Sequence, residues 1–142
     1  MHNGWMRYLA VRLTPREDLR AALGAALAGS SLEAGFVVSG IGSLDGAWIR
    51  YAGASAATRV EGDLEILTLA GSLSPDGVHL HISVSDAQGR VVGGHVAPGC
   101  IVRTTAEILL ALLPGLRFSR ERDPASGWDE LVVRPSPASS AG

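Results

Sequence analysis

The segment that decides the fold is Val78–Val96, with the sequence VHLHISVSDAQGRVVGGHV. We expect two strands in it, over Val78–Ser85 and Arg90–Val96. The residues between them, Asp86-Ala87-Gln88-Gly89, have the composition of a turn. The segment therefore predicts a β-hairpin, in which the two strands pair antiparallel.

Three of the four histidines in the chain lie in this hairpin. His79 and His81 share one face of the first strand, because residues two apart in a strand point the same way. His95 joins them only if the chain folds back beside that strand. Imidazole is the commonest protein ligand of transition metals. The pattern therefore predicts a divalent metal site at His79, His81 and His95.

The register of the hairpin decides whether the three rings meet. If Asp86 pairs with Gly89, the numbers of paired residues add up to 175, and His95 faces away from the other two histidines. One more residue in the turn, or a one-residue bulge, raises the sum by one and places His95 opposite His81. Gly89 in the left-handed conformation, or a bulge at Gly93-Gly94, would supply this shift. The alternative is that the histidines are polar residues of a half-exposed sheet face.

Three imidazoles would leave one metal position open to water, as in catalytic zinc sites. They suit Zn²⁺ and also Ni, Cu, Fe or Mn, so these residues do not identify the ion. Ser83, Ser85 or a backbone carbonyl could hold the second ring nitrogen of a ligand. Glu65, a charged residue in the apolar run Leu64–Ser72, is the candidate catalytic residue: a general base, a second acceptor, or an intersubunit ion-pair partner. The alternative for Glu65 is an ordinary exposed or paired carboxylate.

Composition narrows the class of protein. The chain has 142 residues, 46% hydrophobic and 18% charged, which is typical of one globular domain. Its net charge of -2 lacks the basic footprint of non-specific nucleic-acid binding. Cys100 is the only cysteine, which excludes an intramolecular disulfide, and we expect it to be a buried, inert thiol. We see neither a signal peptide nor a membrane span and expect a cytoplasmic protein.

Two helices are expected. The first is opened by Thr14–Asp18, with Thr14 as N-cap and Glu17 as its capping-box partner, and stops near Gly29-Ser30. The second spans Thr104–Leu113, where Arg103 could pair with Glu107 at helical spacing.

The remaining elements are expected to be strands joined by turns. Ser39–Ser43 (SGIGS) is interpreted as a tight glycine-rich turn, with anion binding by its backbone as the alternative. The pattern predicts a single α+β domain over 7–133 with a mostly antiparallel sheet and two principal helices, preceded by a leader, 1–6, and followed by a disordered tail, 134–142. The expected strands are Arg7–Leu13, Glu33–Ser39, Ala47–Tyr51, Thr58–Glu61, Leu64–Ser72, Leu116–Glu121 and Asp129–Val133.

Several ordered motifs resemble the PPC domain, the "plants and prokaryotes conserved" domain that is also called DUF296. They begin with Ser39–Ser43, continue through Gly62–Leu67 (GDLEIL), Leu69–Ser72 (LAGS), His79–Ser83 (HLHIS) and Gly89–His95 (GRVVGGH), and end with Thr105–Glu107 (TAE) and Arg120–Pro124 (RERDP). The likeness covers roughly 7–133.

The resemblance implies an α+β fold, a homotrimer and the description "predicted DNA-binding protein" that many prokaryotic members carry. In land plants the domain follows an AT-hook, an Arg-Gly-Arg-Pro core that lies in the minor groove; this chain has no such motif. Plant members generally lack histidines at the positions of His79, His81 and His95, whereas some prokaryotic members hold a metal. The metal site therefore transfers better than the DNA role.

Two hypotheses of function follow. The first is a stand-alone prokaryotic PPC protein, homotrimeric, that binds a divalent metal through the three histidines and acts as a regulatory or DNA-binding module. The second is a small metal-dependent enzyme of hydrolase or lyase type that acts on a small polar molecule. A third and weaker interpretation is an assembly module with incidental histidines.

Overall fold

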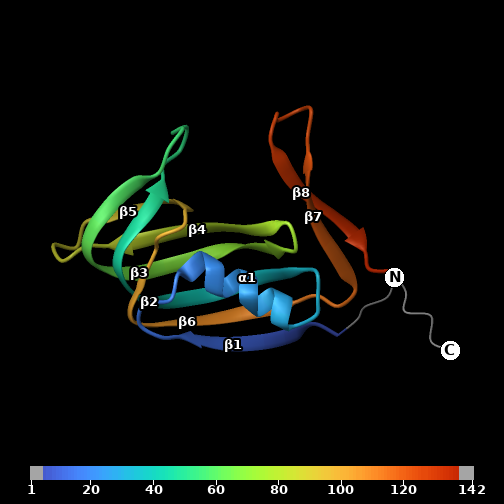
Figure 1. Ribbon diagram of the computed structural model, residues 1–142, viewed down its shortest axis with the longest axis horizontal. Coiled ribbons are helices and arrows are strands. Elements are labelled where there is room, and N and C mark those ends of the chain that lie inside the picture. The colour runs from blue at the N-terminus through green and yellow to red at the C-terminus, as the bar shows by residue number, and fades with distance from the viewer. Residues whose placement is uncertain (1–4, 138–142) are drawn as a thin grey trace.

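The computed structural model describes residues 5–137 as eight strands and one helix (Figure 1). Six strands form one antiparallel sheet in the order β1-β6-β2-β3-β4-β5, and the other two form a separate hairpin. The α+β class with a mostly antiparallel sheet is thus confirmed. The elements are β1 (Arg7–Leu13), α1 (Leu19–Gly29), β2 (Gly35–Arg50), β3 (Thr58–Ser74), β4 (Gly77–Ser85), β5 (Val91–Val96), β6 (Val102–Leu112), β7 (Leu116–Arg122) and β8 (Asp129–Pro135).

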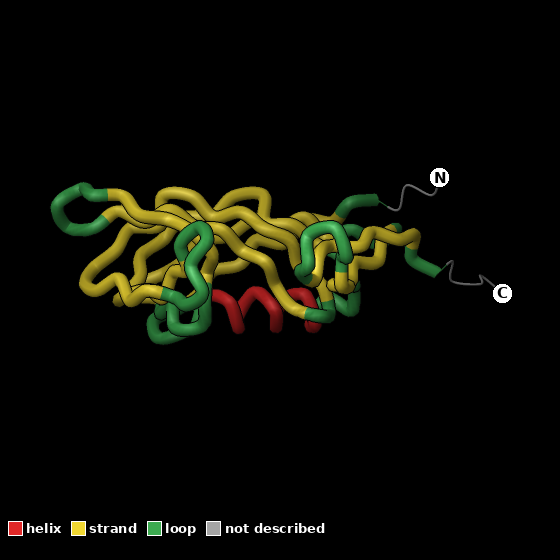
Figure 2. Tube along the Cα trace, turned by 90° about the horizontal axis from the view of Figure 1, so that it is seen from above, coloured by secondary structure: helices red, strands yellow, loops and turns green. Residues whose placement is uncertain are grey.

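Helix α1 lies on one side of the strands (Figure 2). Leu19, Leu23 and Leu27 form its apolar stripe and are almost fully buried. The helix begins at Leu19, later than expected, because the N-cap is Asp18, whose carboxylate accepts a hydrogen bond from the Ala21 N–H at 2.9 Å. The predicted N-cap at Thr14 was wrong, although the Thr14 N–H does donate to its predicted partner, the Glu17 carboxylate, at 2.7 Å.

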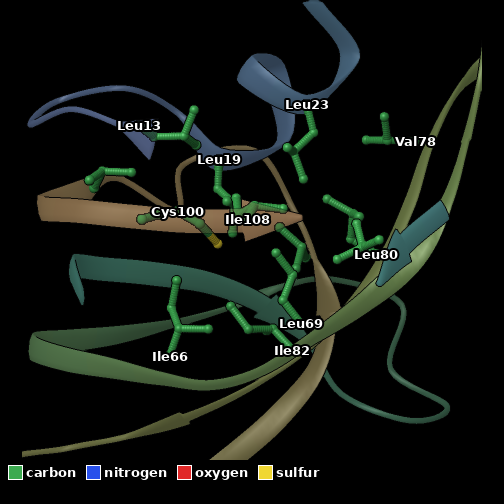
Figure 3. Close-up of a cluster of buried hydrophobic side chains, with 14 of the residues drawn as sticks. Leu13, Leu19, Leu23, Ile66, Leu69, Val78, Leu80, Ile82, Cys100 and Ile108 are labelled. Atoms are coloured by element: carbon green, nitrogen blue, oxygen red, sulfur yellow. The ribbon is translucent and has the colours of Figure 1, made fainter. Parts of the chain in front are cut away.

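Alternate residues of β4 show how strand geometry builds the core. Figure 3 shows Leu80 and Ile82 in one cluster with Leu23 of α1 and Leu69 of β3. Leu80, Ile82 and Val84 are at most 4% exposed and belong to the core. The residues between them therefore point to the opposite face of the sheet, which α1 does not cover.

The second helix was a wrong prediction, because its residues form β6 between β1 and β2. The buried residues Val102, Ala106, Ile108 and Leu110 share one face at even spacing. A central strand is partly covered on both faces, so the apolar run Ile108–Leu112 lacks the polar positions that reveal alternation. High intrinsic helix propensity was overridden by strand pairing on both sides.

The glycine-rich turn was also wrong, because Ser39–Ser43 lies inside the continuous strand β2. Gly42 has φ +152°, and a Cβ there would stand 2.5 Å from the Thr105 carbonyl oxygen. The pairing of β2 with β6 shifts on both sides of this segment, so the glycines serve β-bulges rather than a reversal. Likewise, the two strands predicted within 58–72 are one strand, β3.

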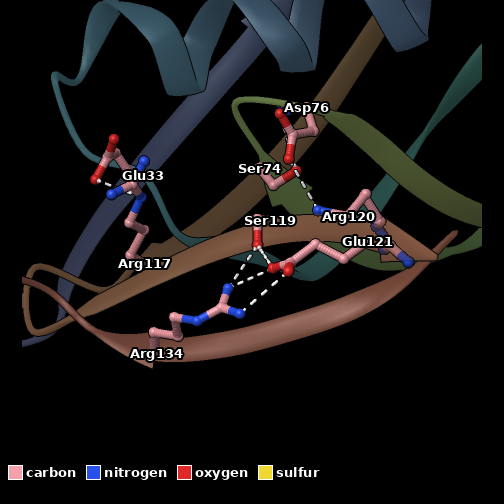
Figure 4. A network of polar contacts seen from close by, with 8 residues as sticks. All are labelled: Glu33, Ser74, Asp76, Arg117, Ser119, Arg120, Glu121 and Arg134. Carbon is pink, nitrogen blue, oxygen red and sulfur yellow. Dashed lines mark hydrogen bonds and ion pairs between the residues drawn. The ribbon is translucent and has the colours of Figure 1, made fainter. Parts of the chain in front are cut away.

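The hairpin of β7 and β8 stands apart from the main sheet (Figure 1) and is attached through its first strand. Phe118 is buried and meets the ring of Phe36 edge-on, with ring centres 5.6 Å apart. Arg117 pairs with Glu33 at 3.7 Å, and Glu121 pairs with Arg134 across the hairpin (Figure 4).

Parts of the predicted leader and tail, 1–4 and 138–142, lie outside the described residues. Within the described part, Arg134 and Pro135 belong to β8. No helix in residues 5–137 is long and apolar enough to cross a membrane.

Candidate metal centre

His79, His81 and His95 converge on the sheet face opposite α1. Their candidate ligand nitrogens all lie within 4.8 Å of one another. The rings of His79 and His95 stack at 4.9 Å, and His81 meets both edge-on, at 5.0 Å and 4.5 Å. His81 is exposed, whereas the other two are half-buried, so the cluster is open on one side.

The register that brings them together comes from a three-residue turn. His81 pairs with His95, and every pair in this ladder adds up to 176. The Asp86 N–H donates to the Arg90 carbonyl oxygen at 2.9 Å, which leaves Ala87-Gln88-Gly89 as the turn. Gly89 takes the left-handed conformation, with φ +77°. The extra turn residue that the metal hypothesis requires is therefore present.

The Asp86 side chain holds this turn together. Its Oδ1 accepts hydrogen bonds from the N–H groups of Gln88 and Arg90, both at 2.9 Å, and its Oδ2 pairs with the Arg90 guanidinium at 2.7 Å. The backbone N–H of Arg90 is the main reason why the pKa of Asp86 lies below its usual value. One carboxylate thus supports both the turn and the register of the histidines.

Glycines let neighbouring strands approach the site closely. A Cβ on Gly71 would stand 2.0 Å from the carbonyl oxygen of His79, and one on Gly94 would stand 2.5 Å from that of Arg50. Arg50 pairs with His95 where β5 meets the end of β2, so the sheet closes on itself beside the histidines. The Gly93-Gly94 pair therefore permits close backbone contact between strands.

The surroundings favour neutral imidazoles. Partial burial is the main cause that lowers the pKa of His79 to about 4, and the positive charge of Arg120 adds to it. The pKa of His95 is also lowered, by burial and then by Arg50. Only the neutral ring can donate its lone pair to a metal, so His79 and His95 are kept in their ligating form.

Arg120 of β7 and Glu130 of β8 lie beside the histidines. The sequence did not indicate this position for either residue. A cleft of about 380 Å³ runs between the β7–β8 hairpin and the main sheet. Arg120 and Glu130 line it together with His79 and His81. The motif that contains Arg120 is part of the family resemblance, but no role follows from it. Arg120 is about 40 residues from His79 and His81 in the sequence, and proximity over that separation cannot be read from local hydrophobic periodicity.

Glu65 is not part of this cluster. It is exposed on β3 and pairs with Ser85, four residues beyond His81 along β4, or about 13 Å at the rise of a strand. It does not line the cleft. A catalytic or supporting role at the histidines is therefore not favoured by its position.

The remaining candidates have structural environments. Glu107 is exposed on β6, and Arg103 pairs with Asp63 at 3.1 Å, so the expected helical pair does not form. Cys100 is fully buried, and burial raises the pKa of its thiol to about 11.

Comparison with known proteins places this geometry in context. Over 135 residues the chain is 47% identical to the bifunctional protein GlmU of Synechococcus sp. (strain JA-2-3B'a(2-13)). The match covers 95% of this chain but 21% of GlmU, so the chain spans about a fifth of the length of that relative.

Two solved structures share the fold. A hypothetical protein from Salmonella cholerae-suis is 40% identical with a TM-score of 0.89, over 94% of this chain and 99% of that one. A metal-containing protein from Archaeoglobus fulgidus has a TM-score of 0.76 over 89% and 93% of the two chains, and its 24% identity supports the fold alone.

The family model of the Plants and Prokaryotes Conserved (PCC) domain matches residues 2–114, about four-fifths of the chain. This is the family that is also abbreviated PPC, so the resemblance seen in the motifs is confirmed. The β7–β8 hairpin lies beyond the residues that the family model matches. The chain belongs to the Plants and Prokaryotes Conserved domain family.

Proposed function

We propose that this protein binds a divalent transition metal ion through His79, His81 and His95 and works as a metal-dependent regulatory module. The observation that carries the proposal is the convergence of three imidazoles on one open sheet face. The close packing of His79, His81 and His95 needs a reason, because no side-chain hydrogen bond holds any of the three rings within the described residues. A shared ion supplies that reason.

The residues present fit such an ion. Metal–nitrogen bonds of about 2.1 Å hold tetrahedral ligands roughly 3.4 Å apart, and the observed nitrogens lie within 4.8 Å. Small rotations of the rings would close the difference. When bound, the ion would supply Lewis acidity and an open coordination position. Three neutral nitrogens favour Zn²⁺ but accept other ions of the first transition row.

The test is elemental analysis of untagged protein beside two variants. We expect near-stoichiometric metal in the parent, loss of the metal in His81→Ala, and retention in Val91→Ala, which changes an exposed residue on the same face of β5 as His95 but outside the cluster. Metal absent from the parent after exposure to Zn²⁺, Ni²⁺ and Mn²⁺ contradicts the proposal. Equal metal in the parent and His81→Ala contradicts it as well.

We also propose a homotrimer that assembles through the sheet face opposite α1. Phe36, Val38, Ile41 and Leu67 are 41–53% exposed there. Isolated proteins rarely leave such a set of large apolar side chains in contact with water. A neighbouring copy would cover them.

A DNA-binding role is suggested by the names of two related solved structures. Proteins of this fold from Bacteroides thetaiotaomicron and Ralstonia eutropha are named as candidate DNA-binding proteins, but at 21% and 22% identity. This chain has a net charge of -2. If the trimer contacts DNA, its affinity falls steeply with salt; no mobility shift at low salt with excess protein excludes this role.

A metal-dependent enzyme is the second candidate function, and the cleft beside the histidines favours it. Arg120 and Glu130 place an anion-binding group and a carboxylate next to the open side of the cluster. Turnover of small esters or hydroxy acids that requires both the metal and Glu130 would support this function over simple binding.

A further inference from the structure

The cleft between the β7–β8 hairpin and the main sheet is lined by Arg120. This residue is held by hydrogen bonds but makes no ion pair among residues 5–137. The Arg120 backbone N–H donates to the Asp76 carboxylate at 2.9 Å, and its Nη2 donates to the Ser72 hydroxyl at 2.7 Å. Figure 4 shows Asp76 anchoring the β7 backbone at this point. The side chain is therefore oriented before any ligand arrives.

Two other arginines of the β7–β8 hairpin provide a contrast. Arg117 pairs with Glu33, and Arg134 pairs with Glu121 (Figure 4). Arg120 is half-buried, and one of its five side-chain N–H groups donates a hydrogen bond to Ser72. The remaining donors are free to bind an acceptor that enters the cleft.

We propose that the cleft binds a small molecule with one carboxylate, held between Arg120 and the open side of the histidine cluster. This inference rests on the proposed metal site, because the metal and the guanidinium would face the same group. A guanidinium fork matches a carboxylate in shape and charge, which gives stronger hydrogen bonds than a neutral pair.

The lining of the cleft also limits the ligand. Its volume of about 380 Å³ leaves ample room for a small organic molecule beside the metal, so charge and hydrogen bonding set the limits. Glu130 shares the lining of the cleft with His79 and Arg120, so its negative charge faces the same space. A second anionic group on the ligand would be repelled there, whereas a hydroxyl could donate to Glu130. A small hydroxy acid meets both conditions.

The experiment uses the full chain loaded with Co²⁺, whose visible spectrum reports changes at the metal. Glycolate, acetate and the neutral glycolamide are titrated in turn. We expect glycolate to bind most tightly, acetate less, and glycolamide least. In Arg120→Gln the affinity for glycolate should fall about tenfold, the worth of one charge-assisted hydrogen bond.

Arg122→Gln is the matched control, because it removes an exposed arginine two residues along β7 that does not line the cleft. It should bind glycolate like the parent, and all variants should retain Co²⁺. In Glu130→Gln the preference for glycolate over acetate should shrink. Arg120→Lys keeps the charge without the fork and should bind glycolate with intermediate affinity.

The outcomes separate the two proposals. A parent that takes up no metal overturns the proposed function. A parent that takes up Co²⁺, but binds glycolate no better than glycolamide or no better than Arg120→Gln does, overturns the carboxylate site and leaves the metal site standing.

Discussion

Gly71 shows how one residue controls the position of a candidate ligand. It lies in β3 with φ +153°, directly against the backbone of His79. A side chain there cannot be accommodated unless β3 and β4 separate, and His79 moves with β4. Conformation and close approach both restrict this position to glycine.

We predict that Gly71→Ala destabilises the protein and weakens metal binding together. Gly62→Ala is the control, because Gly62 also has a positive φ, +92°, but has open space around it. Backbone strain alone should cost roughly 1–2 kcal/mol in the control, and overpacking should add about 1–3 kcal/mol at Gly71. Denaturant unfolding and zinc titration of both variants measure this; equal losses in the two would refute the steric argument.

Cys100 gives a second prediction at this scale. Because burial raises the pKa of its thiol to about 11, the group is protonated at pH 8 and has no access to solvent. Iodoacetamide should leave the native protein unmodified and label it fully in denaturant. Rapid labelling of the native protein, read by mass spectrometry, would show that this region opens.

The residues of the site were only partly predictable. The three histidines could be found because i, i+2 spacing and turn parity are local rules. Arg120 and Glu130 could not, because the position of the hairpin over the sheet depends on tertiary contacts such as the packing of Phe118 on Phe36. Glu65 was singled out for its charge in an apolar strand, yet alternation alone explains its exposure.

Among the elements, the β7–β8 hairpin is the one whose attachment bears on function. It carries Arg120 into the cleft, while its own strands are joined across the ladder by Glu121 and Arg134. The side-chain hydrogen bond from Arg134 is the main cause that lowers the pKa of Glu121 to about 2. The pair therefore stays ionised under mildly acidic conditions.

This shift predicts an acid dependence of stability. A carboxyl with a lowered native pKa stabilises the fold fully above its ordinary pKa of 4.5, and the contribution is lost as the pH falls toward about 2. In metal-free protein, Glu121→Gln should therefore lose less thermal stability between pH 5 and pH 2.5 than the parent. Both groups are exposed, so the difference should be small; parallel melting curves would show that the pair contributes nothing.

The errors at the level of elements have a common cause. The sequence predicted the short strands β1, β4, β5, β7 and β8 within one or two residues, whereas the long strands β2, β3 and β6 were divided or taken for a helix. The long strands change register at β-bulges, several of them beside glycines, and bury parts of both faces. Local patterns then resemble turns and buried helices.

The whole molecule has two unlike sides. One side holds α1 and the core, and the other presents the histidines and large exposed apolar side chains. The class and the antiparallel sheet were predictable from the balance of short strands and turns. Which side chains lie on which face of the sheet was not predictable, because this depends on the registers of all six strands.

The proposed assembly through the sheet face opposite α1 gives a prediction for the whole molecule. Val38→Asp should convert a species of about three times 14.7 kDa into monomers, since a charge would be buried at the interface. Val133→Asp is the control, because Val133 is equally exposed, at 53%, but lies on β8. Sedimentation equilibrium measures both; a monomeric parent, or a Val38→Asp trimer, would contradict this interface.

The alternation along β4 has a consequence for how the protein can change. Its even-numbered residues maintain the core and its odd-numbered ones carry the histidines. Substitutions at the odd-numbered positions can therefore change the chemistry of this surface without changing the core on the other side of the strand. The same property makes β4 a natural template for engineering, in which new ligands for other ions can be written into the odd positions while the even ones are left untouched.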